Sequence, residues 1–134
     1  MDINELIENF ELLDDWEDKY RYIIDLGAGL PPLEDRFRTE EWKVRGCQSQ
    51  VWLVPEKKDG RLFFKGDSDA AIVKGIISVV LTIFSGKTPE EILQVDVDSL
   101  FGRLGLQEHL SPSRRNGLLS MIEKIRFYAS HLQE

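Results

Sequence analysis

Hydrophobic residues recur at helical spacing along the N-terminal part of the chain. One stripe follows the three-to-four-residue period of an α-helix and consists of Ile3, Leu6, Ile7, Phe10 and Leu13. A second stripe comes directly after it and consists of Trp16, Tyr20, Ile23, Ile24 and Gly27. The glycines and then the prolines of "LGAGLPPLE" end this pattern. We therefore predict two amphipathic helices, followed by a surface loop over residues 33–39.

The pattern then changes to that of β-strands. Val44 and the run "QVWLV" carry the β-branched and aromatic residues that strands favour, and "RLFFKGD" is a second run of this kind. Between the two runs, "EKKDGR" contains an Asp-Gly pair, which is a strong signal for a tight hairpin turn. The sequence therefore predicts an antiparallel hairpin in the middle of the chain.

The C-terminal half of the chain returns to helical patterns. "GIISVVLTIF" is apolar on most sides, so the helix predicted from Asp69 to about Ser85 is buried in the centre of the domain. Thr88-Pro89 is a cap and first-turn proline that starts a short helix, and "SLFGRLGLQEHL" is a helix broken by glycines. Ser111-Pro112 repeats the same device before a last helix. Its apolar stripe consists of Leu118, Leu119, Ile122, Ile125 and Tyr128 or Ala129.

The order of these elements decides the expected fold class. Two helices, a small antiparallel sheet and three or four further helices make an α+β fold, in which helices pack on a hairpin-based sheet. The chain has 134 residues and a mass of 15.5 kDa, and it shows neither a linker nor an internal repeat. We expect a single domain over residues 1–134, large enough to bury a core without disulfides.

Composition and charge exclude several classes of protein. Lys and Arg total 17 against 24 Asp and Glu, so the net charge of −7 lacks the basic footprint of nucleic-acid binding. The acidic N-terminus differs from a signal or transit peptide, and no apolar run reaches the ~20 residues that span a bilayer. One cysteine cannot form an internal disulfide, which favours a reducing compartment. We expect a cytoplasmic protein that binds neither nucleic acid nor a membrane.

That cysteine, Cys47, lies in an unusually polar stretch. A free cysteine is most often a small buried hydrophobe, but a core cysteine usually belongs to an apolar pattern. The neighbours of Cys47 are instead polar, charged or glycine: Arg45, Gly46, Gln48, Ser49 and Gln50. The glycine permits a sharp bend, and the nearby arginine would lower the pKa of the thiol. The pattern predicts a mobile, reactive thiol at the end of a strand.

Several chemistries could use such a thiol. A metal site needs three or four ligands, and one cysteine with two histidines makes a weak set. A Cys–His hydrolase with His109 as its base is conceivable, although neither histidine stands in a recognisable motif. A thiol that exchanges sulfur with a partner protein needs no second catalytic group. This last interpretation fits the residues best, and we predict no bound metal or cofactor.

Longer stretches of the chain resemble a known family. "GCQSQVWLV", "GDSDAAIVKGIISVV", "LSPSRRNGLLSMIEKI" and "WEDKYRYIIDLGAGLPPL" are together similar to the SufE family of sulfur acceptors, over nearly the whole chain. The resemblance implies a fold like that of SufE and of the IscU scaffolds. It also implies a partner, a pyridoxal-phosphate cysteine desulfurase of the SufS type. The SufE-like protein is then not a stand-alone enzyme, because it takes sulfur from that enzyme, stimulates it, and passes the sulfur on to an iron–sulfur scaffold such as the SufBCD complex.

The resemblance also assigns roles to individual residues. Cys47 would accept the sulfur as a persulfide and, between deliveries, would fold back over an apolar floor that we place on the helix at 70–84. Asp67, Ser68 and Asp69 are helix caps on the simplest interpretation, and the resemblance adds that their turn holds the cysteine loop. Arg114 would dock the desulfurase or steady the loop. Trp42 departs from the family pattern, which often has Asn there, so the approach into the loop or the partner's footprint differs.

Three other interpretations compete with the sulfur carrier. A cluster scaffold of the IscU type uses three cysteines, and this chain offers one, so the scaffold interpretation loses on ligand count. A sulfur carrier of the CsdE type would serve another desulfurase and another acceptor. A Cys–His hydrolase or thiol oxidoreductase would show turnover alone, whereas a carrier should show none without its desulfurase. We expect the carrier to be a monomer or a weak dimer.

Overall fold

A computed structural model describes residues 2–47 and 49–131 of the chain. Within them the chain forms seven α-helices, two short 3-10 helices and one antiparallel sheet of two strands, so the predicted α+β fold is confirmed. The elements, in chain order, are α1 (Ile3–Glu11), α2 (Trp16–Ala28), η1 (Asp35–Phe37), η2 (Glu40–Trp42), β1 (Val51–Lys58), β2 (Arg61–Ser68), α3 (Ala71–Phe84), α4 (Pro89–Leu93), α5 (Val97–Leu104), α6 (Leu106–His109) and α7 (Pro112–His131).

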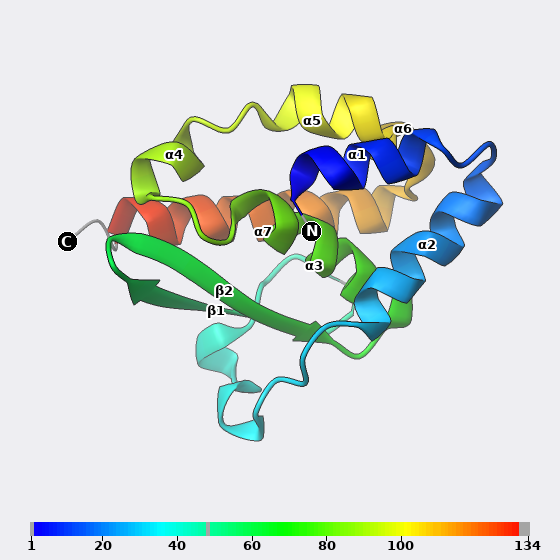
Figure 1. The fold of residues 1–134 in the computed structure, drawn as a ribbon. Coiled ribbons are helices and arrows are strands. Elements are labelled where there is room, and N and C mark those ends of the chain that lie inside the picture. The colour runs from blue at the N-terminus through cyan, green and yellow to red at the C-terminus, as the bar shows by residue number, and fades with distance from the viewer. Residues whose placement is uncertain (1, 48, 132–134) are drawn as a thin grey trace.

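The hairpin forms one side of the molecule, and helices cover one of its faces (Figure 1). Helix α3 packs on β2 and α7 packs on α3, while α1 lies against α3 and α5 on the side away from the sheet. The segment with η1 and η2 runs along the other face of the hairpin and contacts β1. No described helix is both long enough and apolar enough to cross a bilayer.

Polar residues at helix ends explain where several helices begin. The carboxylates of Asp2 and Asp15 accept the backbone N–H groups of Glu5 and Asp18, each at 2.9 Å, and so cap α1 and α2. At α4, Thr88 forms the reciprocal capping box with the residue three positions on, and a proline fills the first turn. The helix starts predicted at Trp16 and at Pro89 are therefore confirmed.

The strand register follows from the Asp-Gly turn. Lys58 pairs with Arg61, which leaves Asp59 and Gly60 as a two-residue loop with φ values of 53° and 76°. Positive φ at both positions matches the turn type whose twist suits a hairpin. With this register, Leu53 and Leu62 are fully buried, and the predicted hairpin is confirmed.

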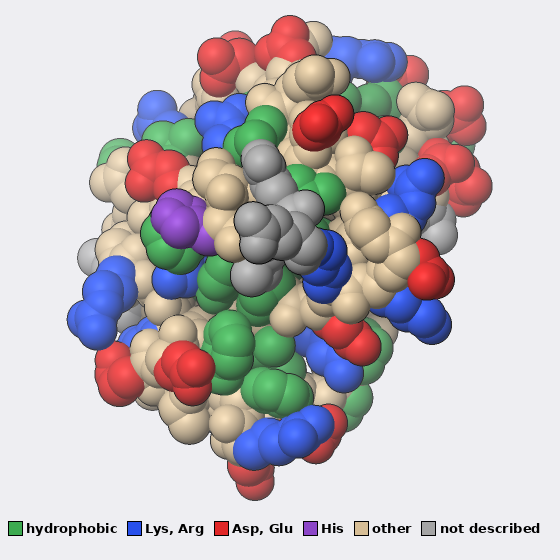
Figure 2. Space-filling model, turned by 90° about the vertical axis from the view of Figure 1, so that its left-hand side faces the viewer, with side chains coloured by type: hydrophobic (Ala, Val, Ile, Leu, Met, Phe, Trp, Pro, Cys, Tyr) green, Lys and Arg blue, Asp and Glu red, His purple; other side chains and the backbone are tan. Residues whose placement is uncertain are grey.

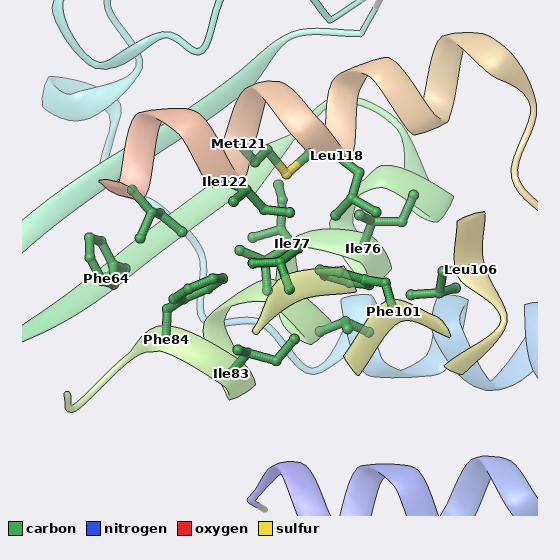
Figure 3. Close-up of a cluster of buried hydrophobic side chains, with 14 of the residues drawn as sticks. Phe64, Ile76, Ile77, Ile83, Phe84, Phe101, Leu106, Leu118, Met121 and Ile122 are labelled. Carbon is green, nitrogen blue, oxygen red and sulfur yellow. The ribbon is translucent and has the colours of Figure 1, made fainter. Parts of the chain in front are cut away.

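The core lies between the sheet and the helices (Figure 3). Its members come from β1, β2 and nearly every helix, and the largest side chains include Phe84, Phe101, Ile76 and Ile77.

Three predictions about burial are wrong. Ile24 and Leu119 are 40% and 44% exposed, because each lies at the edge of its helical stripe, and Leu33 of the predicted surface loop is 5% exposed. Leu33 packs with Trp52 and Val54 in a small second cluster.

Two glycines let α2 and α3 cross at very short range. A Cβ atom at Gly27 would lie 2.8 Å from the backbone carbon of Lys74, and one at Gly75 would lie 2.6 Å from the backbone carbon of Ile23. Real Cβ atoms do not approach backbone so closely, so neither position has room for a side chain. This close crossing fixes the position of α3 relative to α2, and the first turn of α3 borders the cysteine loop.

Some large apolar side chains remain on the surface. Figure 2 shows the side of the molecule where the hairpin turn and the C-terminal end of α7 lie, and hydrophobic side chains there are interspersed with charged ones. Phe63 of β2, Leu93 of α4 and Phe127 of α7 are 39%, 39% and 50% exposed. Scattered exposure of this kind is normal for a small domain.

Candidate functional site

The loop that carries Cys47 is closed at its base by strand pairing. Lys43 bridges to Trp52, and the N–H of Val44 donates to the carbonyl of Val51 at 2.8 Å. Residues 45–47, 49 and 50 therefore lie outside this pairing, in the loop that leads into β1. At its bend, Gly46 has a φ of 90°, which L side chains rarely adopt. The bend predicted at Gly46 is confirmed, and the mobility and reactivity of the thiol stay predictions.

The thiol of Cys47 lies over a cavity of about 210 Å³ between the first turns of α3 and α7. The loop itself is exposed at Arg45 and Gly46, but Cys47 is half-buried. The cavity has an apolar floor and a polar rim. Its lining residues besides Cys47 are Ala70, Ile72, Val73 and Ile76 from the start of α3, Gly117 and Met121 from α7, and Ser49, Ser111, Ser113 and Arg114 at the rim.

Burial sets the protonation of this thiol. Loss of contact with water raises the pKa of Cys47, because the charged thiolate is the form that burial disfavours. The thiol also donates to the carbonyl oxygen of Gly117, with an Sγ–O distance of 3.7 Å. The prediction that Arg45 lowers this pKa is wrong. Arg45 is 83% exposed and pairs with Glu40 at 3.8 Å, so water screens its charge.

Asp69 connects the start of α3 to the far end of the cysteine loop. Its carboxylate accepts the backbone N–H of Gln50 at 3.0 Å, and its own N–H donates to the carbonyl of Gln50 at 3.4 Å. The prediction that residues 67–69 cap the central helix is wrong. The N-cap of α3 is Ala70, without a side-chain bond, and Ser68 accepts only the N–H of Ala70 itself, at 3.3 Å.

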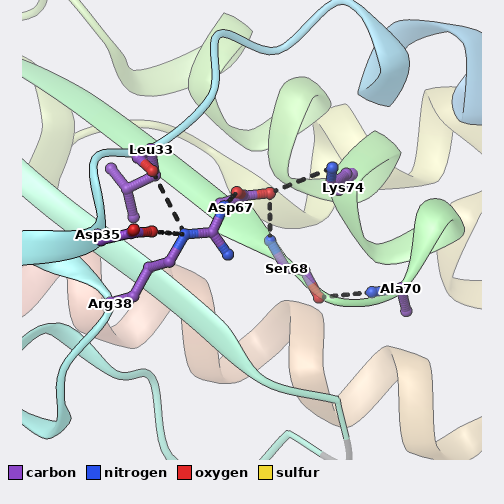
Figure 4. Close-up of polar contacts among 7 residues, drawn as sticks. All are labelled: Leu33, Asp35, Arg38, Asp67, Ser68, Ala70 and Lys74. Carbon is purple, nitrogen blue, oxygen red and sulfur yellow. Dashed lines mark hydrogen bonds and ion pairs between the residues drawn. The ribbon is translucent and has the colours of Figure 1, made fainter.

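Asp67 belongs to a buried polar cluster at the end of β2 (Figure 4). Its side chain is 4% exposed, pairs with Arg38, and lies 3.5 Å from the ammonium of Lys74. It also accepts the N–H of Ser68 at 2.8 Å. Arg38 donates in turn to the carbonyl of Leu33 at 3.3 Å. The cluster ties the segment around η1 to β2 and α3, and neither Asp67 nor Ser68 lines the cavity.

The other predicted site residues fall into separate groups. Ser49 and Arg114 line the cavity, Gln50 reaches the site through its backbone, and Gln48 lies outside the described residues. Arg114 is an exposed residue of the first turn of α7, and its N–H donates to the hydroxyl of Ser111 at 3.4 Å. Trp42, the departure from the family pattern, packs edge-on against Phe37 beside the hairpin.

Apart from Arg114, sequence reasoning missed the cavity residues of the last helix. Gly117 and Met121 of α7, and Ser111 just before it, line the cavity far from Cys47 in the sequence. A glycine inside an otherwise helical apolar stripe was the available signal for Gly117, because such a glycine usually has a packing reason. The apolar stripe of the last helix does not indicate that Cys47 is the residue that contacts Gly117.

The histidine and metal alternatives find no support in the described residues. His109 stacks on Trp16 with ring centroids 4.1 Å apart, and it does not line the cavity of Cys47. His131 stacks on Phe127 in the same way, at 4.0 Å. In the described part of the chain, no three of His, Cys, Asp and Glu are grouped as metal ligands would be. Over residues 2–47 and 49–131, the arrangement therefore presents a nucleophile with no neighbouring base.

Comparison with known proteins identifies related chains. The family model for SufE, described as an Fe-S metabolism associated domain, matches residues 4–129. An uncharacterized SufE-like protein of Rhizobium meliloti is 50% identical over 128 residues, covering 92% of this chain and 91% of that protein. One from Rhizobium etli is 48% identical over 128 residues and covers 92% and 86%. The solution structure of a hypothetical protein from Thermus thermophilus matches with a TM-score of 0.77 over 96% and 93% of the chains; at 21% identity it supports the fold alone.

Proposed function

The chain belongs to the SufE family, and from that membership we propose that it is the sulfur acceptor and activator of a cysteine desulfurase, with Cys47 as the accepting residue. The family acts in iron–sulfur metabolism. In our proposal Cys47 takes one sulfur atom as a persulfide and passes it to an iron–sulfur assembly scaffold. The protein is then a partner that the desulfurase needs, without a reaction of its own.

The observation that carries this proposal is the sheltered position of the one cysteine. A thiol that burial keeps protonated, with no base or metal beside it among the described residues, is a poor catalyst alone. The same position is well suited to a carried persulfide, which reductants and oxidants in solution would otherwise destroy. The loop around the thiol has a flexible bend at Gly46 and polar neighbours, which suit it to leaving the cavity when a partner docks.

The transfer step conserves atoms and electrons. The desulfurase carries an outer sulfur on its own cysteine, and the Cys47 thiolate attacks that outer sulfur. A bond forms between Cys47 Sγ and the outer sulfur, while the bond between the two donor sulfurs breaks and the donor cysteine leaves as a thiolate. The proton lost by Cys47 passes to solvent or to the departing thiolate. No external oxidant or reductant is consumed, and the freed enzyme can begin another turnover.

The partners follow from the same proposal. The donor is a pyridoxal-phosphate desulfurase of the SufS type, the onward acceptor is a scaffold such as the SufBCD complex, and this chain holds no cofactor of its own. Exposed Arg114 on the cavity rim is the residue we assign to docking. A carrier of the CsdE type, with another desulfurase and acceptor, would use the same cavity and is distinguished by which enzyme it stimulates.

An intact-mass experiment tests the proposal. The purified protein is mixed with a SufS-type desulfurase and free cysteine, and we expect an adduct of about 32 Da, one sulfur atom, on Cys47. The Cys47→Ser variant is the matched control, and it should gain no mass and should not raise desulfurase turnover. Full stimulation by the serine variant, or turnover by the carrier without the desulfurase, would contradict the proposal.

A further inference from the structure

The thiol of Cys47 rests directly on one residue of α7, Gly117. A Cβ atom built on Gly117 would stand 3.4 Å from Sγ and 3.9 Å from Cβ of Cys47. Among the described residues, no other atom outside its own helix and chain neighbours lies within 4 Å of that position. Gly117 is buried and lines the cavity beside the thiol. A Cβ atom at residue 117 would therefore just contact the sulfur, and a larger side chain would compete with the sulfur for the same space.

A second close approach lies next to the first. Gly46, immediately before Cys47, is so near α7 that a Cβ atom there would lie 2.7 Å from the hydroxyl oxygen of Ser120. The loop thus approaches α7 at two adjacent points, one turn of the helix apart. The approach at Gly46 requires a glycine, and the approach at Gly117 leaves room for a Cβ atom but not for a larger side chain. A glycine inside a helix costs about 0.5–1 kcal/mol of stability relative to alanine, so a helix glycine that faces only a cysteine needs a reason.

We propose that Gly117 is a positioning residue for the acceptor: its missing side chain forms the seat on which Cys47 rests, and that seat keeps the thiol sheltered until a partner lifts the loop. The carbonyl oxygen of Gly117 accepts a hydrogen bond from the thiol and would repel a thiolate, so the seated form is the protonated, unreactive one. The raised pKa of Cys47 agrees with this arrangement. Reactivity is then linked to the position of the loop.

This inference rests on the proposed function for its meaning, but its test needs no desulfurase. We measure the rate at which iodoacetamide alkylates Cys47 in the free protein and in Gly117→Ala and Gly117→Val. The alanine Cβ would just contact the sulfur, and the two further methyl groups of valine would occupy its place. We expect a graded rise in rate, to about tenfold for valine, because overpacking shifts such an equilibrium by this order.

The matched control is Gly102→Ala in α5. That glycine is also helical, and no described atom outside its own helix backbone and chain neighbours lies within 4 Å of its Cβ position, so it tests helix stabilisation without the contact to Cys47. The alkylation rate of this control should equal that of the wild type. The pH profile supplies a second readout: the midpoint for Gly117→Val should fall towards ~8.5, the value of a solvated thiol, and that of Gly102→Ala should stay at the wild-type value.

The outcomes separate this proposal from the proposed function. Equal alkylation rates in wild type, Gly117→Ala and Gly117→Val, with unchanged pH midpoints, would contradict the positioning role of Gly117. A rise in Gly102→Ala as large as that in the Gly117 variants would contradict it too. If Gly117→Val does not fold, Gly117→Ser takes its place, because serine also carries an atom beyond Cβ and is a better helix former than glycine. Failure of the sulfur adduct on wild-type Cys47 would refute the carrier function and leave the alkylation result standing. If both hold, Gly117→Val should need less protein than the wild type for half-maximal desulfurase stimulation.

Discussion

Removal of the Asp69 carboxylate should release the end of the cysteine loop. In the folded protein this carboxylate accepts the N–H of Gln50 at 3.0 Å, three residues after Cys47. In Asp69→Ala the loop loses this side-chain bond, although the backbone bond between the same two residues, at 3.4 Å, remains. The variant keeps every residue that lines the cavity. It therefore changes how firmly the loop is held and leaves the site chemistry intact.

The size of the effect can be worked out from the exposure of the bond. A buried hydrogen bond to a charged group contributes about 1.5–3 kcal/mol, but Asp69 is exposed and water competes for both partners. We take about 1 kcal/mol for the net contribution, which is about a fivefold change in an equilibrium constant. If alkylation proceeds from a rare open form that recloses quickly, its rate follows the open population. The expected result is a rise of about fivefold in the alkylation rate of Cys47.

The assay compares Asp69→Ala with a variant that loses the same kind of bond elsewhere. In Asp2→Ala, the carboxylate that accepts the N–H of Glu5 at 2.9 Å is removed from the start of α1. Both variants should lose a similar free energy of unfolding, and only Asp69→Ala should react faster with iodoacetamide. Asp69→Asn keeps an acceptor oxygen and should fall between wild type and alanine. Equal rates for Asp69→Ala and wild type would refute the reasoning.

Two further variants test the parts of the fold that hold the site. Gly75→Ala should lower the free energy of unfolding by about 3 kcal/mol in urea titrations, because its Cβ would lie 2.6 Å from the backbone carbon of Ile23. Gly102→Ala, with open space at its Cβ, should be neutral or slightly stabilising, and an equal loss in both would contradict the tight crossing. Asp67→Asn should cost about 1–2 kcal/mol, less than a fully buried pair, because its two cationic partners are 34% and 41% exposed. Asp35→Asn, from a fully exposed carboxylate, is the control, and a similar loss there would show that burial of Asp67 is unimportant.

Local patterns were sufficient to predict most of the secondary structure. The Asp-Gly turn, the capping box at Thr88 and the helical stripes each depend on residues a few positions apart, and the structure has all of them. The errors lie at the edges of the patterns. Whether Ile24 or Leu119 is buried depends on how far neighbouring elements extend around each helix, and a single period does not contain that information.

The sequence by itself determined the α+β order of elements, the hairpin register and the identity of Cys47 as the one thiol. These features follow from side-chain periodicity, turn chemistry and composition, which are local or countable properties. Only the tertiary structure decided that the thiol is sheltered and that burial raises its pKa. It also decided that Arg45 pairs with Glu40 and does not lower the pKa of Cys47. The cavity is built from the loop, from α3 and from α7, which lie far apart in the chain. Because the state of a thiol depends on which atoms exclude water from it, that state was decided only when the chain folded.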